Sequence, residues 1–219
     1  MRATREAFGE HLPVMGEKHN NIVALDADLG GATKIRSFGQ AHPDRFFQMG
    51  IAEANMIGVA SGISEYDYKV FLASFGSFLT GRYDQIRTQM GLEDVSIMRA
   101  LPNMKVLNPA TFSEAIKVIE YLCETDLDSP YYLRLGRQPV EDIEIPFEFG
   151  KGQIVLEGDD ITLLSTGCIL GDVMESASII EDMTQMSVRV VSFTSLKPID
   201  RDMIVKCAQE TKQLFTIED

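Results

Sequence analysis

The sequence predicts an α/β protein whose parallel sheet is covered by helices on both faces. Short apolar stretches typical of buried strands alternate along the chain with longer stretches of helical periodicity. Gly, Pro, Asn and Asp separate these stretches, and these residues are common in turns. Strands that alternate with helices favour βαβ units, which build parallel sheets.

The first run of alternating elements extends to residue 135. A helix is expected at 4–18, where Ala7, Phe8, Leu12 and Met15 recur at helical spacing. Thr111 and Glu114 predict a capping box for a later helix. The other expected helices are 52–65, 78–89, 92–101 and 111–124, and the expected strands are 21–25, 45–49, 69–74, 105–107 and 131–135.

A polar connector marked by prolines, residues 138–152, separates this run from a second one. We therefore expect a first domain at 1–140, a linker at 141–152 and a second domain at 153–219. Because the sequence ends after an apolar strand that looks buried, we expect the second domain to be incomplete. Its expected strands are 160–165, 187–193 and 213–217, and its expected helices are 170–182 and 200–211.

Composition narrows the classes of function. The 219 residues are 45% hydrophobic and carry a net charge of -13, which disfavours nucleic acid or an anionic membrane as a partner. No apolar run is long enough to span a bilayer. Cys123, Cys168 and Cys207 lie far apart without CxxC spacing, so neither a disulfide framework nor a zinc site is expected. A cytoplasmic protein is predicted.

Glu53 is the first candidate for chemistry. It follows an expected strand and opens a helix of small residues, and open α/β sheets bind ligands at the carboxyl ends of their strands. Its neighbours are apolar, which favours the protonated form of a carboxyl, so Glu53 could share a proton with a heterocyclic nitrogen. The alternative is an acid that interacts only with the helix dipole.

Two aromatic residues follow the next expected strand. Phe75 and Phe78 are separated by small residues, and aromatic faces in such a place can stack on a flat ring. The alternative is that both side chains belong to the core.

Four stretches give a resemblance to a known family. They are RFFQMGIAEANMIGVASG, SFGSFLTGRYDQIR, MRALPNMKVLNP and YYLRLGRQPV. In this order and spacing they resemble the pyrimidine-binding domain of transketolase and of its relative deoxyxylulose-phosphate synthase. GDDITLLSTG and VVSFTSLKPID resemble the start of the family's C-terminal domain. The resemblance therefore implies a thiamine-diphosphate-binding fold followed by an incomplete transketolase C-terminal-like domain.

The resemblance implies roles for several residues at the cofactor. Glu53 matches the catalytic glutamate that hydrogen-bonds the aminopyrimidine N1′, and Phe78 matches an aromatic residue packed on that ring. Phe75 and Ile51 would line the same pocket, as would Met56. Asp28 matches an acid at the cofactor site, although a loop or capping aspartate is an equally good interpretation.

The resemblance also implies a phosphate site and a missing metal site. Arg5 and Arg137 match two arginines that hold the sugar phosphate, and guanidinium groups suit phosphate oxygens. Both could instead be surface arginines. The chain has no GDG…N motif, so it is expected to contribute no metal ligand. The Mg²⁺ ligands are expected on a separate diphosphate-binding chain.

The implied function is a transketolase subunit that transfers a two-carbon ketol unit between sugar phosphates, in carbohydrate metabolism and the pentose phosphate pathway. The implied assembly is a heterotetramer with an N-terminal, diphosphate-binding transketolase subunit, and activity would require that partner. Three alternatives stay open: a deoxyxylulose-phosphate synthase, a 2-oxo-acid dehydrogenase β-like subunit, and a non-catalytic subunit that has lost an active-site loop.

The sequence departs from the family between Gln89 and Met90. A couple of dozen residues of the family pattern are missing there, namely a strand and a loop of the GEDGxxHQ type. Because loss of a central strand should destabilise a sheet, we hypothesise that the protein has this segment although the sequence lacks it.

Overall fold

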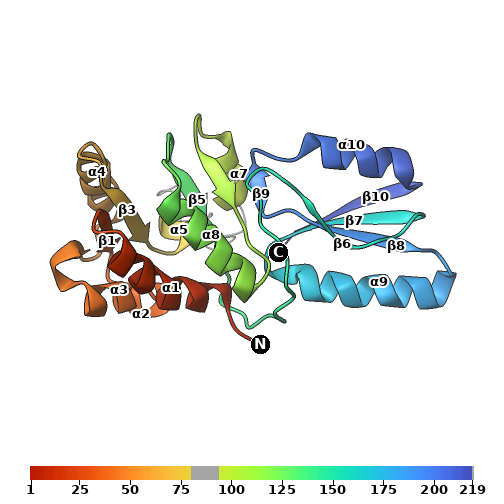
Figure 1. The fold of residues 1–219 in the computed structure, drawn as a ribbon, viewed down its shortest axis with the longest axis horizontal. Coiled ribbons are helices and arrows are strands. Elements are labelled where there is room, and N and C mark those ends of the chain that lie inside the picture. Colours follow the sequence, from red (N-terminus) through yellow and green to blue (C-terminus); the bar gives the residue numbers. More distant parts are fainter. Residues whose placement is uncertain (80–93, 219) are drawn as a thin grey trace. The chain divides into compact units, whose positions relative to one another are not determined.

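The computed structural model describes residues 1–79 and 94–218 (Figure 1). These residues form two compact units. Unit 1 consists of Met1–Thr4, Arg99–Val118 and Asp128–Asp219, and unit 2 consists of Arg5–Met98 and Ile119–Leu127. None of the described helices is both long and apolar enough to cross a membrane.

The sheet of unit 2 is fully parallel. Strand β1 (Ile22–Asp26) lies between β2 (Phe46–Gln48) and β3 (Lys69–Ala73). The apolar run of β1 explains its central place, because all five of its residues are buried. The helical segments that accompany this sheet are α1 (Thr4–Lys18), α2 (Gly30–Thr33), α3 (Arg36–Ala41), η1 (Pro43–Arg45), α4 (Glu53–Ser64) and α5 (Gly76–Leu79).

Helix α4 packs against β1 through a narrow apolar strip. Met56 and Ala60 are buried in a core cluster with Val23, Leu25 and Ala27. Most of the other residues of α4 are exposed or half-buried. The small side chains of this helix therefore leave a broad uncovered surface on unit 2.

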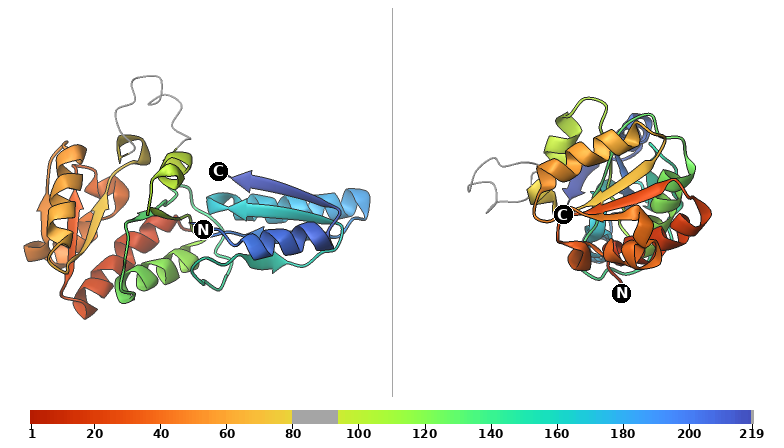
Figure 2. Two further views of the ribbon diagram at one scale, coloured as in Figure 1. Left: turned by 90° about the horizontal axis from the view of Figure 1, so that it is seen from above. Right: turned by 90° about the vertical axis from the view of Figure 1, so that its left-hand side faces the viewer.

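The larger sheet of unit 1 has four strands in the order β10-β7-β8-β6. Strands β7 (Ile161–Thr166), β8 (Val188–Ser192) and β10 (Gln213–Glu218) are parallel, and β6 (Gln153–Leu156) pairs with β8 in antiparallel orientation. Helices α9 (Leu170–Thr184) and α10 (Arg201–Glu210) lie on opposite faces of this sheet (Figure 1). Strand β10 lies at one edge of this sheet and β6 at the other, and Figure 2 shows the sheet from a second side.

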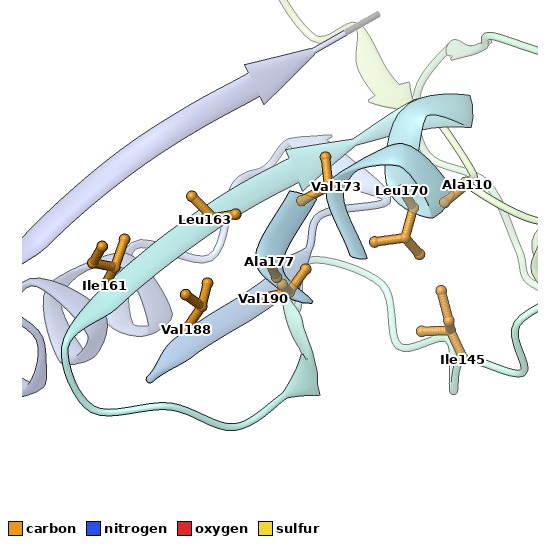
Figure 3. Packing of buried hydrophobic residues seen from close by; sticks show 9 residues of the cluster. All are labelled: Ala110, Ile145, Ile161, Leu163, Leu170, Val173, Ala177, Val188 and Val190. Carbon is orange, nitrogen blue, oxygen red and sulfur yellow. The ribbon is translucent and has the colours of Figure 1, made fainter. Parts of the chain in front are cut away.

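One apolar cluster joins α9 to this sheet (Figure 3). Leu170, Val173 and Ala177 of α9 pack against valine, leucine and isoleucine side chains of β7 and β8. Ile145 adds a side chain from the polar connector and is almost fully buried. The connector thus lacks helices and strands but still contributes to the core.

A second, smaller sheet of unit 1 combines distant parts of the chain. Its order is β5-β4-β9, with β4 (Lys105–Leu107) parallel to β5 (Tyr131–Leu133) and antiparallel to β9 (Ser195–Lys197). Strand β9 comes from the second run of the sequence and β4 from the first. Unit 1 therefore contains segments from both runs.

The predicted α/β class is confirmed, and so is most of the alternation of strands and helices. Strand 213–217 was wrongly predicted to be buried: β10 is mostly exposed, because it has a neighbour on one side only. The expected helix 92–101 appears as α7 (Asp94–Ala100). Most of the expected helix 78–89 and the Gln89–Met90 junction lie outside the described residues.

The capping box of α8 (Phe112–Glu124) forms with one change of partner. The Thr111 hydroxyl accepts the N–H of Glu114 at 3.2 Å, as predicted. The Glu114 carboxylate accepts the N–H of Ala110 at 2.7 Å, one residue before the cap. Glu114 is fully buried and also accepts a hydrogen bond from the Thr194 hydroxyl. The predicted cap is therefore part of a buried network that links α8 to the segment before β9.

Candidate functional site

The predicted cofactor residues of unit 2 follow its three parallel strands. Parallel strands end at the same edge of a sheet, and loops at that edge are the usual ligand site of open α/β folds. Asp28 follows β1, Ile51 and Glu53 follow β2, and Phe75 and Phe78 follow β3. The fold therefore brings five of the predicted residues to one edge.

Glu53 is the first residue of α4 and is half-buried. Ala52, which precedes the helix, provides no side-chain cap. The Ser74 hydroxyl, after β3, donates to Oε1 of Glu53 at 3.5 Å. A carboxyl at a helix N-terminus lies in the favourable end of the helix dipole. The loop after β3 thus supplies a hydroxyl that can orient the carboxyl opening α4.

Phe75 and Phe78 form an aromatic pair after β3, close in sequence to Ser74, which donates to Glu53. Their ring centroids are 5.8 Å apart and their planes are tilted by 39°. Phe78 is 44% exposed, so part of its ring remains available for contact. The prediction that both rings are only core residues is thereby disfavoured for Phe78.

Apolar residues around Glu53 differ in their surroundings. Ile51 is 84% exposed, so within this chain it does not form a wall of a pocket. Met56 is fully buried below α4 and belongs to the core cluster. Met56 therefore contributes to the core of unit 2, and its expected place in a pocket wall stays a prediction.

Two residues that sequence reasoning missed organise this edge. Asp26, the last residue of β1, is fully buried and accepts the N–H groups of Leu29 at 3.0 Å and Gly30 at 2.9 Å. Gln48, the last residue of β2, donates its amide Nε2 to Asp26 at 2.8 Å. The available signal was a polar residue at the last position of these two strands, whereas β3 ends in Ala73.

The turn after β1 places Asp28 on the surface. Asp28 has a left-handed backbone with φ of 64°, and its side chain is exposed. Its N–H donates to the Gln48 side chain at 3.0 Å. The structure therefore does not use Asp28 as a helix cap, because the carboxylate of Asp26 accepts the free N–H groups of this turn.

The two predicted phosphate-binding arginines belong to different units. Arg5 lies in the first turn of α1 in unit 2, and its Nη1 donates to the carbonyl of Ala32 at 2.9 Å. The buried Nε of Arg5 has no hydrogen-bond partner among the described residues. Arg137 is exposed in unit 1. The two side chains are therefore not assigned to one site by this structure.

The backbone beside Arg137 is closely packed. The N–H of Gly136 donates to the Thr4 hydroxyl at 2.7 Å. A Cβ at position 136 would lie 2.3 Å from Sγ of Cys168, a distance that real contacts do not reach. Glycine is therefore required at 136 unless Cys168 moves.

Among residues 1–79 and 94–218, no three His, Cys, Asp or Glu side chains gather in a way that could hold a metal ion.

Comparison with protein families gives two matches that together span nearly the whole chain. The transketolase pyrimidine-binding domain matches residues 1–91 and 81–142, and the transketolase C-terminal domain matches residues 150–219. The first domain thus matches in two stretches that overlap around the Gln89–Met90 junction. An alignment of 250 positions with one relative, against 219 residues here, agrees with a missing stretch.

Individual relatives lead to the same family. A protein described as a transketolase C-terminal section from Methanocaldococcus jannaschii is 34% identical, and the alignment covers 100% of this chain and 77% of the relative. The 6-deoxy-6-sulfo-D-fructose transketolase subunit SqwH of Clostridium sp. (strain MSTE9) is 30% identical, with 98% and 75% covered. 1-Deoxy-D-xylulose-5-phosphate synthases are also among the relatives.

A solved structure supports the fold. It is described as a split gene transketolase, inactive beta4 tetramer, and is 36% identical with a TM-score of 0.90, over 100% of this chain and 80% of that one. The chain thus belongs to the transketolase family, and it combines the family's pyrimidine-binding domain with sequence of its C-terminal domain.

Proposed function

We propose that the chain is the pyrimidine-binding subunit of a thiamine-diphosphate-dependent transketolase that moves a two-carbon ketol unit between sugar phosphates. It acts together with a separate, N-terminal diphosphate-binding chain, in a heterotetramer of two copies of each. The spacing of its three free cysteines supports a reducing, cytoplasmic location. Its pathway is carbohydrate metabolism by way of pentose phosphates.

The observation that carries this proposal is the position of Glu53 at the start of α4, at the sheet edge that also bears Phe75 and Phe78. A carboxyl that can exchange a proton and a nearby aromatic face are what an aminopyrimidine ring requires. The residues present therefore fit the pyrimidine half of thiamine diphosphate. When bound, this cofactor supplies an electron sink for breaking a carbon–carbon bond next to a carbonyl.

Glu53 holds the proton that is shared with the pyrimidine N1′ in this proposal. The Ser74 hydroxyl orients its carboxyl, and the exposed face of Phe78 supports the ring. Asp28, on the neighbouring turn, contributes an acid to the same edge. Ile51, which is 84% exposed, is an apolar side chain that a partner chain could cover at this edge.

The diphosphate and Mg²⁺ are assigned to the partner chain. The described residues gather no set of three metal-ligating side chains, and the sequence has no GDG…N motif. As separate candidates for contact with the sugar phosphate we propose Arg137 of unit 1, which follows the Gly136 that donates to Thr4, and Arg5 of unit 2.

The test is the ketol-transfer rate of the chain mixed with its diphosphate-binding partner. Glu53→Gln keeps the size of the side chain but removes its ability to exchange a proton, so we expect a rate loss of about 10²–10⁴-fold. Glu65→Gln, at the exposed C-terminal end of α4, is the matched control and should keep the wild-type rate. A Glu53→Gln enzyme with an unchanged rate and unchanged thermal unfolding would contradict the proposal.

One alternative is supported by a specific observation. The family model matches the first domain in two overlapping stretches, in agreement with the missing loop, and this favours a non-catalytic subunit. An intact mass of 24.4 kDa together with no transfer rate would support that alternative. The synthase alternative predicts product from pyruvate and glyceraldehyde 3-phosphate, and the dehydrogenase alternative predicts decarboxylation of a 2-oxo acid without a sugar phosphate.

A further inference from the structure

The side chain of Gln48 connects two loops at the carboxyl edge of the unit 2 sheet. Its Oε1 accepts the N–H of Asp28 at 3.0 Å, after β1, and the N–H of Gly50 at 3.2 Å, after β2. Its Nε2 donates to Oδ2 of Asp26 at 2.8 Å. One amide therefore uses both of its ends, and it links the turn carrying Asp28 to the loop leading into Glu53.

Asp26 determines which way this amide faces. Its carboxylate is fully buried and accepts three N–H groups, from Leu29, Gly30 and Gln48. A carboxylate only accepts hydrogen bonds, so Nε2 must point toward it and Oε1 toward the two backbone N–H groups. Gly30 allows this approach, because a Cβ there would lie 2.5 Å from Oδ2 of Asp26.

Both backbone N–H groups that Gln48 accepts belong to residues with a left-handed backbone. Asp28 has φ of 64°, which is uncommon for a non-glycine residue, and Gly50 has φ of 69°, which glycine adopts freely. The hydrogen bond from the Asp28 N–H to Gln48 therefore stabilises a conformation that is unfavourable by itself. For Gly50, the hydrogen bond to Gln48 selects one of several conformations that glycine can adopt.

We infer that Asp26 and Gln48 are positioning residues, which fix the Asp28 turn and the Gly50 loop so that Asp28 and Glu53 stand at set places on the cofactor edge. The role of the two loops in holding residues at a cofactor rests on the proposed function. The hydrogen-bond network itself is a property of the chain alone. Small losses of position at such a site are costly, because reacting groups must be held closely.

The first measurement is amide hydrogen exchange by NMR on the full chain. Gln48→Glu places a second carboxylate beside Asp26 and removes the Nε2 donor, so the side chain is expected to leave the two loops. We expect the Asp28 and Gly50 amides to exchange about tenfold faster, which corresponds to the loss of one hydrogen bond each. Gln40→Glu, an exposed glutamine on α3 with the same change of charge, should leave both rates as they are.

A second variant separates the network from a general effect of charge. Gln48→Leu removes the side-chain amide without adding a charge, so nothing at position 48 accepts from the Asp28 and Gly50 N–H groups. Both exchange rates should rise about tenfold, as in Gln48→Glu. Exchange rates in either variant equal to those of the Gln40→Glu control would overturn the inference.

The second measurement is the affinity of the assembled enzyme for thiamine diphosphate by calorimetry. Gln48→Glu should weaken it about tenfold, while kcat at saturating cofactor falls much less. Faster amide exchange with unchanged affinity would overturn the positioning role but leave the network. If the wild-type assembly binds no cofactor, the proposed function is contradicted. The exchange rates of the Asp28 and Gly50 amides would still show whether Gln48 holds the two loops.

Discussion

The two units bury the strands of their sheets to different extents. In unit 1, every residue of β7 and of β8 is buried, and α9 closes one face of the sheet with the cluster around Leu170 and Val190. In unit 2, β1 is buried but every residue of β3 is only half-buried. Helix α4 buries Met56 and Ala60 and leaves Ile57 44% exposed.

This difference concerns the sheets, because apolar side chains are exposed on helices of both units, such as Met183 in unit 1 and Ile57 in unit 2. The large sheet of unit 1 obtains its packing from its own helices. Unit 2 exposes apolar side chains on the segments that carry the predicted cofactor residues, such as Ile51 beside Glu53. Exposed apolar groups gathered around a site indicate a surface for a partner or ligand. The uncovered surface and the candidate site therefore belong to the same part of the molecule.

Two fully buried carboxyls follow the same division. Glu114 in unit 1 accepts from Ala110 and Thr194, and it links a helix of the first sequence run to a segment of the second. Asp26 in unit 2 accepts from two turn N–H groups and from Gln48, at an edge that faces outward. Glu114 therefore stabilises the packing of a helix against a distant segment, whereas Asp26 fixes the conformation of the turn after β1.

The largest expected effect tests the packing of unit 1. Leu170→Ala removes a side chain that is 1% exposed and leaves a cavity between α9 and the sheet, so the free energy of unfolding should fall by about 2–5 kcal/mol. Ile57→Ala removes a 44% exposed side chain from a helix, where alanine is the better helix former, and should cost about 1 kcal/mol or less. Urea unfolding of both variants measures the two values.

Equal losses would contradict the comparison, because Ile57 would then be as well packed in the isolated chain as Leu170. A loss near zero for Leu170→Ala would mean that the unit 1 cluster adjusts to fill the cavity. Met183→Ala, a 79% exposed position on α9, provides the control for the loss of side-chain atoms without a cavity.

An intermediate effect is expected for the pH dependence of stability. Burial raises the pKa of Glu114 above its ordinary value of 4.5, against the opposing hydrogen bonds from Thr194 and Ala110. Between pH 4.5 and the raised value, the folded protein keeps a proton that the unfolded chain releases. The free energy of unfolding should therefore fall as pH rises through this window.

Glu114→Gln removes that proton equilibrium and should flatten this part of the profile, measured by urea unfolding between pH 4 and 8. A wild type that loses stability over this range, together with a variant that does not, would show that the buried Glu114 of unit 1 causes the pH dependence. A variant that loses stability with pH as steeply as the wild type would show that other groups cause the slope.

The smallest effect is expected for a surface ion pair of unit 1. Lys212 Nζ lies 2.7 Å from Oδ1 of Asp160, and its hydrogen bond, followed by that of the Ser187 N–H, lowers the pKa of Asp160. A lowered carboxyl pKa stabilises the fold above the ordinary value near 3.8, and this contribution is lost as pH falls. Lys212→Met should therefore lower Tm by about 1 °C at pH 7 and leave it unchanged at pH 2.

Lys206→Met, an exposed lysine on α10, controls for the loss of one positive charge. A Tm decrease for Lys212→Met as large as that for Leu170→Ala would mean that surface charge, and not the apolar cluster, dominates the stability of unit 1.

Sequence reasoning placed the candidate site residues at the ends of strands that the structure contains, but it missed short elements of the fold. Glu53 and the Phe75–Phe78 pair were predicted from their places after apolar strands, and the structure brings them to one edge. Strand β9 was missed, because a three-residue strand has no periodicity to detect and exists only through its pairing with β4. Helices α2 and α3 were missed because they are short and contain Gly30, Gly31 and Gly39.

The sequence by itself determined the α/β class, the family and the residues that follow each strand, because apolar periodicity and motif spacing are local properties of the chain. Only the tertiary structure decided that Asp26 and Gln48 form one network, that Met56 belongs to the core, and that β10 is exposed. These facts depend on which side chains meet across strands far apart in sequence. Such meetings follow from sheet order and register, which no single stretch of the chain encodes.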